Sequence, residues 1–548
     1  MTKIPFKDAP INYDQRILFP SNVFDLLPIA HECYVYKDII NQLDTSDLEQ
    51  QYSVRGQHAY HPKLILGILI YSYSHGLFSS REIEKQCHEN LAFMYISENN
   101  CPNFRVISDF RKDNYKYFKA CFKQVVLIAR EAGMVSLGHV SLDGSKFDAD
   151  TSKHKAMSYG RLKEAEGELV REIEELLEKA RQADAEEDEH YGERSGNELS
   201  EELQIKEKRL ARIKSARESL EKREAELNPG KKIDDKKQIS FADPDPRIMG
   251  KKGDFAYRYN GQISVDSAHQ MIVGEHLSKN ANDKKEVEPA LKEIKETTGE
   301  HPDKCSIDNG YFSGANLKAL SETNIDVFVA PGKGEPLDLD GVDGEEWNKN
   351  NNKDLDQEKE KEKETEAENE EDKDKDKDKG VEVEVEVDVE KGKFQKSRFS
   401  YNSDMDSFIC PVGHVLELKT EKKDGTKIYQ CEKSVCGSCR NKRRCCSSSK
   451  GEGRSIRTDE YEPLRAAMRE KMSREESKEI YKKRKVIVEP VFGQIKNMGF
   501  RRFHVRGFTR ASGEFSLVCM VHNIRKMVLG VFRGVVRLDR GKLVSNYV

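Results

Sequence analysis

Two short runs decide the fold, Gly261-Gln-Ile-Ser-Val-Asp266 and Met271-Ile-Val-Gly-Glu-His-Leu277, which are separated by a polar turn. Runs of this length and composition are typical of neighbouring strands, so we expect a β-hairpin. An earlier strand is expected over 137–142, ending at Asp143-Gly144. The hairpin is therefore predicted to belong to a larger sheet.

The residues after the hairpin alternate between helical and strand patterns. A helix is expected over 283–298, a strand over 304–307 ending at Asp308, a helix near 315–322 and a strand over 325–330. This order predicts an α/β fold, a mixed sheet with helices on its faces. Asn282-Asp283 is predicted to cap the first helix, with an approach to the functional site as the alternative.

The remaining segments differ in character from this core. Residues 1–133 are predicted to be helical, with His61-Pro62 and Ser79-Ser80 as helix starts, and fit a helix-turn-helix DNA reader or a dimerising bundle equally well. Two apolar stripes over 159–232 predict an antiparallel helical hairpin. Its alternative roles are a solvated spacer, a DNA clamp and a dimer arm.

Charge is distributed unevenly along the 548 residues. The formal net charge is −5, but an acidic tract of Lys-Asp and Val-Glu repeats fills 354–391, so the rest of the chain is net basic. The tract cannot bury a core, and disorder is expected over 333–400. A basic remainder favours a nucleic-acid partner over a membrane. Because we find neither a spanning run nor a secretion signal, we expect a cytoplasmic, nucleoid-associated protein.

The segment 481–510 is strongly basic and contains a single acid, Glu489. On one continuous helix, Lys485, Glu489, Phe492 and Lys496 would share a face. A carboxylate flanked by cations suits a metal ion held beside a phosphate. The alternative is a solvated basic helix with one internal ion pair.

Three acids occupy comparable places: Asp143 and Asp308 after strands, and Glu489 on the closing helix. Neighbouring strand ends would bring the aspartates together, and a cation would relieve their repulsion. Oxygen ligands of this kind suit Mg²⁺, and two such ions, for which Mn²⁺ can substitute, support phosphodiester chemistry on DNA. The alternative is that Asp143-Gly144 and Asp308 are ordinary turn residues.

Six passages resemble the DDE transposases of bacterial and archaeal insertion sequences, specifically the 1182 family of the Tyr-x2-Arg-x3-Glu-x6-Lys signature group. They run through nearly the whole chain: YHPKLILGILIYSYSHGLFSSREIEKQCHENLAFMYIS, VSLDGSKFDAD, HKAMSYGRLKEAE, YNGQISVDSAHQMIVGEHLSKNAND, SIDNGYFSG and VEPVFGQIKNMGFRRFHVRG. The resemblance implies an RNase-H-like core with Asp143, Asp308 and Glu489 as catalytic metal ligands. The core would comprise 134–158, 250–332 and 456–530, with a cysteine-cluster subdomain over 401–455.

The resemblance also implies phosphate contacts by the basic segment. One departure from the signature is that four residues separate Arg484 from Glu489 where the signature has three, so that Lys485 takes the expected slot. The spacing from Glu489 to Lys496 is kept. The residues expected to contact DNA are Tyr481, Arg484, Lys485, Lys496, Arg501, Arg502 and Arg506.

Six of the twelve cysteines fall between 410 and 446. In a cytosolic chain such clustering indicates metal ligation rather than disulfides. Cys436-x2-Cys439 supplies half of a tetrahedral zinc site, and Cys410 with Cys431 or Cys445 would complete it. Reduced cysteines that pack a small subdomain are the alternative, and His414 is expected to be a turn residue.

Together these features predict an enzyme that cleaves DNA at the terminal inverted repeats of a mobile element and joins the 3′-hydroxyls to target DNA. A homodimer is expected because two ends must be brought together. The rival interpretations are a structure-specific nuclease of the same fold without strand transfer, and a decayed or non-catalytic DNA-binding protein.

Overall fold

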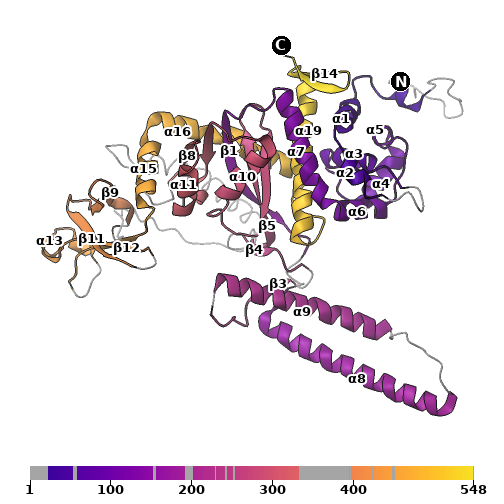
Figure 1. The fold of residues 1–548 in the computed structure, drawn as a ribbon, viewed down its shortest axis with the longest axis horizontal. Coiled ribbons are helices and arrows are strands. Elements are labelled where there is room, and N and C mark those ends of the chain that lie inside the picture. Colours follow the sequence, from indigo (N-terminus) through magenta and orange to yellow (C-terminus); the bar gives the residue numbers. More distant parts are fainter. Residues whose placement is uncertain are drawn as a thin grey trace, which may run out of the picture. The chain divides into compact units, whose positions relative to one another are not determined.

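The computed structural model describes residues 22–52, 59–151, 156–191, 201–228, 230–240, 243–250, 254–331, 394, 396–422, 425–446 and 451–546. The acidic tract over 354–391 lies outside these residues. The fold is mixed α/β, as expected, with many helices and several sheets (Figure 1). It divides into two compact units, called here unit 1 (1–281, 289–301 and 487–548) and unit 2 (282–288 and 302–486).

Unit 1 begins with a helical region, as the sequence predicts. His61 caps α3 at the expected place, accepting a 3.2 Å hydrogen bond from the Lys63 amide. The pattern after Ser79 forms two helices rather than one, because Asn90 ends α4 and its side chain caps α5. The helices are η1 (Val23–Leu26), α1 (Glu32–Asn41), α2 (Ser46–Glu49), α3 (Pro62–Ser74), α4 (Ser80–Glu89), α5 (Leu91–Ile96), α6 (Phe104–Asp113) and α7 (Tyr115–Glu131).

Antiparallel strands form the sheet of unit 1. The predicted hairpin is confirmed as β5 (Ala256–Asp266) paired with β6 (Ile272–Ser278), and β4 (Arg247–Met249) pairs with the start of β5. The first strand was predicted too short. It is β1 (His139–Asp148), because the long β5 keeps its backbone paired beyond Leu142, with Asp143 opposite Ile263. The alternative of an Asp143-Gly144 turn is therefore wrong.

Two long helices, α8 (Tyr159–Tyr191) and α9 (Glu201–Leu227), pack along each other in antiparallel directions. Their direction follows from ion pairs that join Arg217 to Glu166 and Lys206 to Glu172. Small strands β2 (Ala156–Ser158) and β3 (Gln238–Ser240) pair at their base. Their shared core consists of Tyr159, Leu162, Leu169, Ile213, Ala216, Leu220 and Ile239.

The central helix of unit 1 is α19 (Phe508–Phe532), which packs on α7, β6 and α3. It is the one described helix long and apolar enough to cross a membrane, but 72% of the relevant window is buried inside the fold. Burial of this kind is typical of the core helix of a globular protein. The other elements of this region are α10 (Val287–Thr298), α18 (Glu489–Asn497), β14 (Val536–Asp539) and β15 (Lys542–Ser545).

Unit 2 contains the two predicted strands that follow α10. They are β7 (Lys304–Ile307) and β8 (Asp326–Val329), which run parallel with Lys304 opposite Asp326. The connection contains η3 (Asn309–Tyr311) and the expected helix α11 (Gly314–Ser321). Asp308 follows β7 directly, as predicted. Asp283 does not cap α10, because the helix begins four residues later, at Val287.

A second sheet of unit 2 has five strands in the order β13-β12-β11-β10-β9. The strands are β9 (Ser400–Asn402), β10 (Ser407–Ile409), β11 (Val415–Glu421), β12 (Lys427–Gln430) and β13 (Ser455–Thr458), with η4 (Lys396–Arg398), α13 (Lys433–Ser438) and α14 (Lys442–Cys445) beside them. Phe408, Leu416 and Tyr429 form the centre of its core.

The basic segment was predicted as one helix and is instead broken. After α15 (Glu462–Ser473), the segment contains the end of α16 (Glu475–Lys482), then α17 (Arg484–Ile487) and α18. The break follows from two three-residue turns, in which the amide of Val486 bonds the Lys483 carbonyl and that of Val491 bonds Val488. Pro490 at the start of α18 has no amide hydrogen to continue the earlier helix. Lys485 and Glu489 are both exposed but lie in different helices.

Candidate functional site

Asp143 lies in the middle of β1 and is partly exposed. Its carboxylate accepts a 2.8 Å hydrogen bond from the following amide of Gly144. Because side chains alternate along a strand, Asp143, Ser145 and Phe147 share one face of β1. This face carries the residues that contact α18.

Lys496 of α18 joins that face, donating a 2.7 Å hydrogen bond from Nζ to the Ser145 hydroxyl. Burial lowers the pKa of Lys496, and the positive charges of Arg501 and Arg258 lower it further, while Asp143 opposes the shift. The ammonium therefore lies close enough to Asp143 to feel its charge. Shifted pKa values of this kind are common at functional sites.

Glu489 is the first residue of α18 and is exposed. Phe492, one turn later on the same side of the helix, packs on Phe147 with ring centroids 6.2 Å apart. An aromatic cluster thus fixes α18 against β1, and Phe500, Phe503 and Phe515 complete it around Phe147.

The arginines after α18 extend the edge of β1. The amide of Asp148 bonds the Arg501 carbonyl at 3.0 Å, and the amide of Phe503 bonds the Asp148 carbonyl at 2.8 Å. This pairing leaves the side chains of Arg501 and Arg502 exposed. Arg506 is also exposed, but its Nε is 2.9 Å from the Asp150 carboxylate. The predicted DNA-contacting cations of unit 1 therefore lie along the last residues of β1.

In unit 2, Asp308 is held by two of the residues predicted to grip phosphates. Arg484 Nη2 lies 3.3 Å from Asp308 Oδ1, and the Tyr481 hydroxyl lies 3.5 Å from the same oxygen. Arg484 is buried, whereas the Asp308 side chain is 38% exposed. Both residues are thus placed to orient the Asp308 carboxylate.

Asp283, for which an approach to the functional site was the predicted alternative to helix capping, also lies in this part of unit 2. A Cβ atom placed on Gly310 would lie 3.5 Å from Asp283 Oδ2 and 3.8 Å from Asp308 Oδ2. Two carboxylates thus border the same glycine, which has no side chain to separate them. The signal in the sequence was Gly310 itself, two residues after Asp308.

The acids are not gathered into a finished metal centre. In the described part of the chain, no three His, Cys, Asp or Glu side chains are arranged to hold a metal ion. Asp143 and Glu489 belong to unit 1, and Asp308 to unit 2.

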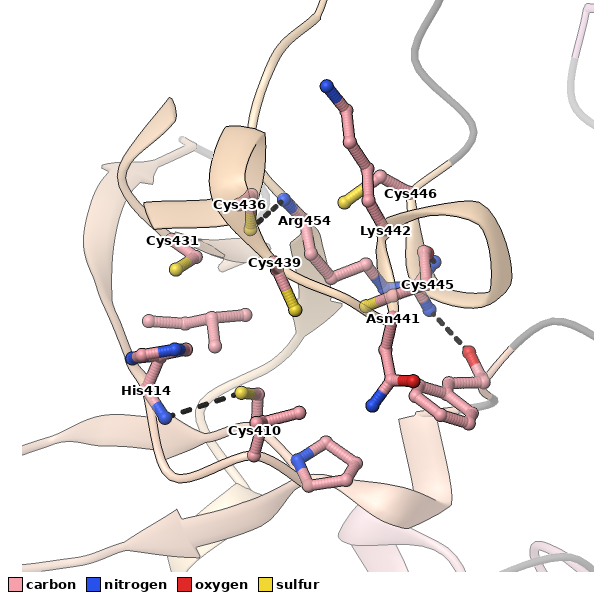
Figure 2. Close-up of a pocket in the computed structure, with 14 residues that line it drawn as sticks. Cys410, His414, Cys431, Cys436, Cys439, Asn441, Lys442, Cys445, Cys446 and Arg454 are labelled. Carbon is pink, nitrogen blue, oxygen red and sulfur yellow. Dashed lines mark hydrogen bonds between the residues drawn. The ribbon is translucent and has the colours of Figure 1, made fainter. Parts of the chain in front are cut away.

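The clustered cysteines line one pocket of unit 2, at the end of the five-stranded sheet (Figure 2). Burial raises the pKa of Cys431 well above the usual thiol range, and the neighbouring Cys436 raises it further. Burial also raises the pKa of Cys446, which Cys436 and Cys445 reinforce. His414 is exposed and contributes its backbone to a turn, as expected.

Comparison with known families gives two matches. Residues 409–528 match the family described as Transposase DDE domain, and residues 21–113 match the Transposase domain (DUF772). The first match includes Glu489, Lys496 and the cysteine pocket, and the second covers most of the N-terminal helices. These matches support a DDE transposase family. No curated protein and no solved structure matches the chain.

Proposed function

We propose that the protein is a DNA transposase that cleaves phosphodiester bonds at the ends of an insertion sequence and joins the 3′-hydroxyls to target DNA. One observation carries this proposal. Lys496, within the segment that matches a transposase DDE domain, contacts Ser145 on β1, two residues from Asp143 and outside that match. The contact connects the matched segment to the strand that carries the first proposed catalytic acid.

Asp143, Asp308 and Glu489 are the proposed ligands of two Mg²⁺ ions, in an RNase-H-like core of the 1182 family. Their oxygen donors suit Mg²⁺, and Asp143, Asp308 and Glu489 are all at least partly accessible. Bound ions would supply an activated water and stabilise the leaving oxygen. Arg484 and Tyr481 hold Asp308 in place for this role.

The cations beside β1 and on α17 are proposed to hold the DNA backbone. Lys496, Arg501 and Arg502 flank β1, and Lys485 is exposed on α17. Phosphate contacts of this kind position a duplex without reading its sequence. The proposed substrate is double-stranded DNA carrying terminal inverted repeats, bound by a homodimer in the cytoplasm.

The test incubates the full-length protein with labelled DNA carrying the flanks of its own gene, with Mg²⁺ or with EDTA. Wild type is compared with Asp143→Asn and Glu489→Gln, and the exposed Asp539→Asn and Glu476→Gln serve as matched controls. We expect metal-dependent cleavage at defined positions, lost in the two site variants and kept in both controls.

Each result of this test separates the rival functions. Joined products in addition to cuts support transposition, whereas cuts that never yield joined products would indicate a nuclease. Binding without cleavage in every lane would indicate a non-catalytic DNA-binding protein. Cleavage by Asp143→Asn at the wild-type rate would overturn the assignment of the site.

A further inference from the structure

The cysteine pocket contains more thiols than a small core requires. Its six cysteines come from three places: the turn after β10, the stretch from the end of β12 through α13, and the end of α14. Figure 2 shows Cys439 pointing into this pocket. The thiols are Cys410, Cys431, Cys436, Cys439, Cys445 and Cys446, and all are free.

Two of the thiols accept hydrogen bonds from backbone amides. The His414 amide donates to Cys410 Sγ at 3.3 Å, and the Arg454 amide donates to Cys436 Sγ at 3.4 Å (Figure 2). The first bond depends on a tight turn in which Gly413 has a φ of +88°, a conformation that favours glycine. Hydrogen bonds from backbone amides are contacts of the kind that orient the ligands of a metal site.

A fixed positive charge borders the same pocket. Arg454 donates from Nη1 to the Cys445 carbonyl at 3.1 Å and from Nη2 to the Phe394 carbonyl at 3.0 Å. Four thiolates around a divalent ion leave a net negative charge, which a nearby guanidinium offsets. The pocket therefore combines thiols, amide donors and a cation, as a metal–thiolate centre requires.

The local core is small for a five-stranded sheet with two helices. It has eight buried residues, and two of these, Cys431 and Cys445, are themselves cysteines. Small cores of this size are commonly stabilised by disulfides or a structural metal. All six cysteines are free thiols, so a metal bound by them would add a link between α13, α14 and the sheet beyond this apolar packing.

We propose that this pocket binds one structural Zn²⁺ through four thiolates, those of Cys410, Cys436, Cys439 and Cys445. Cys410 and Cys436 each accept a hydrogen bond from a backbone amide. Cys439 has the two-residue spacing from Cys436 that zinc sites use, and Cys445 is the buried thiol at the end of α14. The cavity between them, about 20 Å³, admits one body the size of a water molecule.

The present arrangement is open, since no three ligands in the described residues are gathered closely enough to coordinate a metal. Cys431 and Cys446 line the same pocket without belonging to the proposed ligand set. They therefore provide matched controls.

The test measures zinc in the full-length protein, purified without metal-affinity resin, by atomic emission. We expect one Zn²⁺ per chain in the wild type, in Cys446→Ser and in Cys101→Ser, a cysteine outside the pocket. Cys410→Ser and Cys436→Ser should lose it. A protein with no zinc, or Cys410→Ser and Cys436→Ser that retain it, would overturn the proposal.

A second measurement uses wild-type protein, so that it tests the proposal even where the cysteine variants fail to fold. Wild-type protein is stripped with a chelator and refilled with Co²⁺, whose thiolate complexes absorb in the near ultraviolet and whose tetrahedral sites absorb in the visible. We expect both absorptions, with X-ray absorption showing metal–sulfur distances of about 2.3 Å in the zinc form. Oxygen or nitrogen neighbours alone would overturn the thiolate site. Loss of zinc from Cys446→Ser but not from Cys445→Ser would overturn the ligand assignment.

Discussion

Tyr73 of α3 donates a 2.6 Å hydrogen bond to Glu514 of α19, and both side chains are buried. The backbone amide of His504 donates to the other Glu514 oxygen at 2.8 Å. Arg111 donates to the Tyr73 hydroxyl at 3.1 Å and lies 3.9 Å from Glu514. Within unit 1, this network joins part of one segment that matches a transposase domain to part of the other.

Glu514→Gln is expected to destabilise unit 1 by about 3–5 kcal/mol, because it leaves Arg111 buried without its partner charge. Burial alone would raise the pKa of Glu514, but His504 and Arg111 outweigh it and hold the pKa below its usual range. Its stabilisation is therefore present above the unfolded pKa of about 4.3 and is lost as the pH falls through the folded value.

Urea unfolding followed by circular dichroism at several pH values checks this prediction. The exposed Glu89→Gln is the control and should match the wild type. Equal stability of Glu514→Gln and wild type at pH 7 would show that the buried network contributes little.

His522 of α19 is expected to make stability depend on pH over a different range. Burial lowers its pKa to about 4, although the contact of Nε2 with the Gln270 carbonyl, at 3.1 Å, opposes the shift. The unfolded chain takes up the proton first, so stability is full above about pH 6.5 and falls as the pH decreases towards 4. The loss is at most about 3 kcal/mol.

The variant His522→Gln should flatten the dependence of the unfolding free energy on pH over this range. The His269 ring is only partly buried, so His269→Gln should keep the wild-type slope. Thermal unfolding across the range measures both. An unchanged slope in His522→Gln would assign the pH dependence to other groups.

Local sequence patterns predicted the strands of the core well and their extent less well. β7 begins and ends where it was predicted to, between Asp303 and Asp308. The predicted first strand ended too early, at Leu142, because Asp143-Gly144 is a strong turn signal. Its true length depends on pairing with β5, a contact distant in sequence that no local pattern encodes.

The candidate site shows the same limit. The chemistry of Asp308 and Arg484 was visible in the sequence, but their ion pair was not, because it joins β7 to a helix far along the chain. The helix break near Val488 depends on backbone turns that residue spacing does not reveal. For Asp283 the sequence left helix capping and an approach to the site as alternatives, and the fold decides between them by placing its carboxylate beside Gly310.

Arg484→Met should loosen the region around Asp308 and lower stability by about 1–2 kcal/mol, since charged hydrogen bonds contribute about 1.5–3 and Asp308 is partly solvated. Hydrogen exchange of the β7 and η3 amides would report this loosening. Tyr481→Phe, which removes only a 3.5 Å contact, should change exchange much less. Identical protection in Arg484→Met and wild type would show that the ion pair does not position Asp308.

Lys496→Met is expected to weaken binding to all DNA sequences alike, and to reduce the salt dependence of binding by about one ion. The reason is that the proposed function assigns one phosphate contact to its half-buried ammonium, which also donates to Ser145. Lys496→Arg should restore most of the affinity, and the exposed Lys542→Met should not alter it. Because burial and neighbouring cations lower the pKa of Lys496, its contribution should fade as pH rises, before ordinary lysines lose their charge near about 10.4. Fluorescence anisotropy over a salt and pH series measures each effect. A salt slope unchanged in Lys496→Met would remove this lysine from the DNA-binding surface.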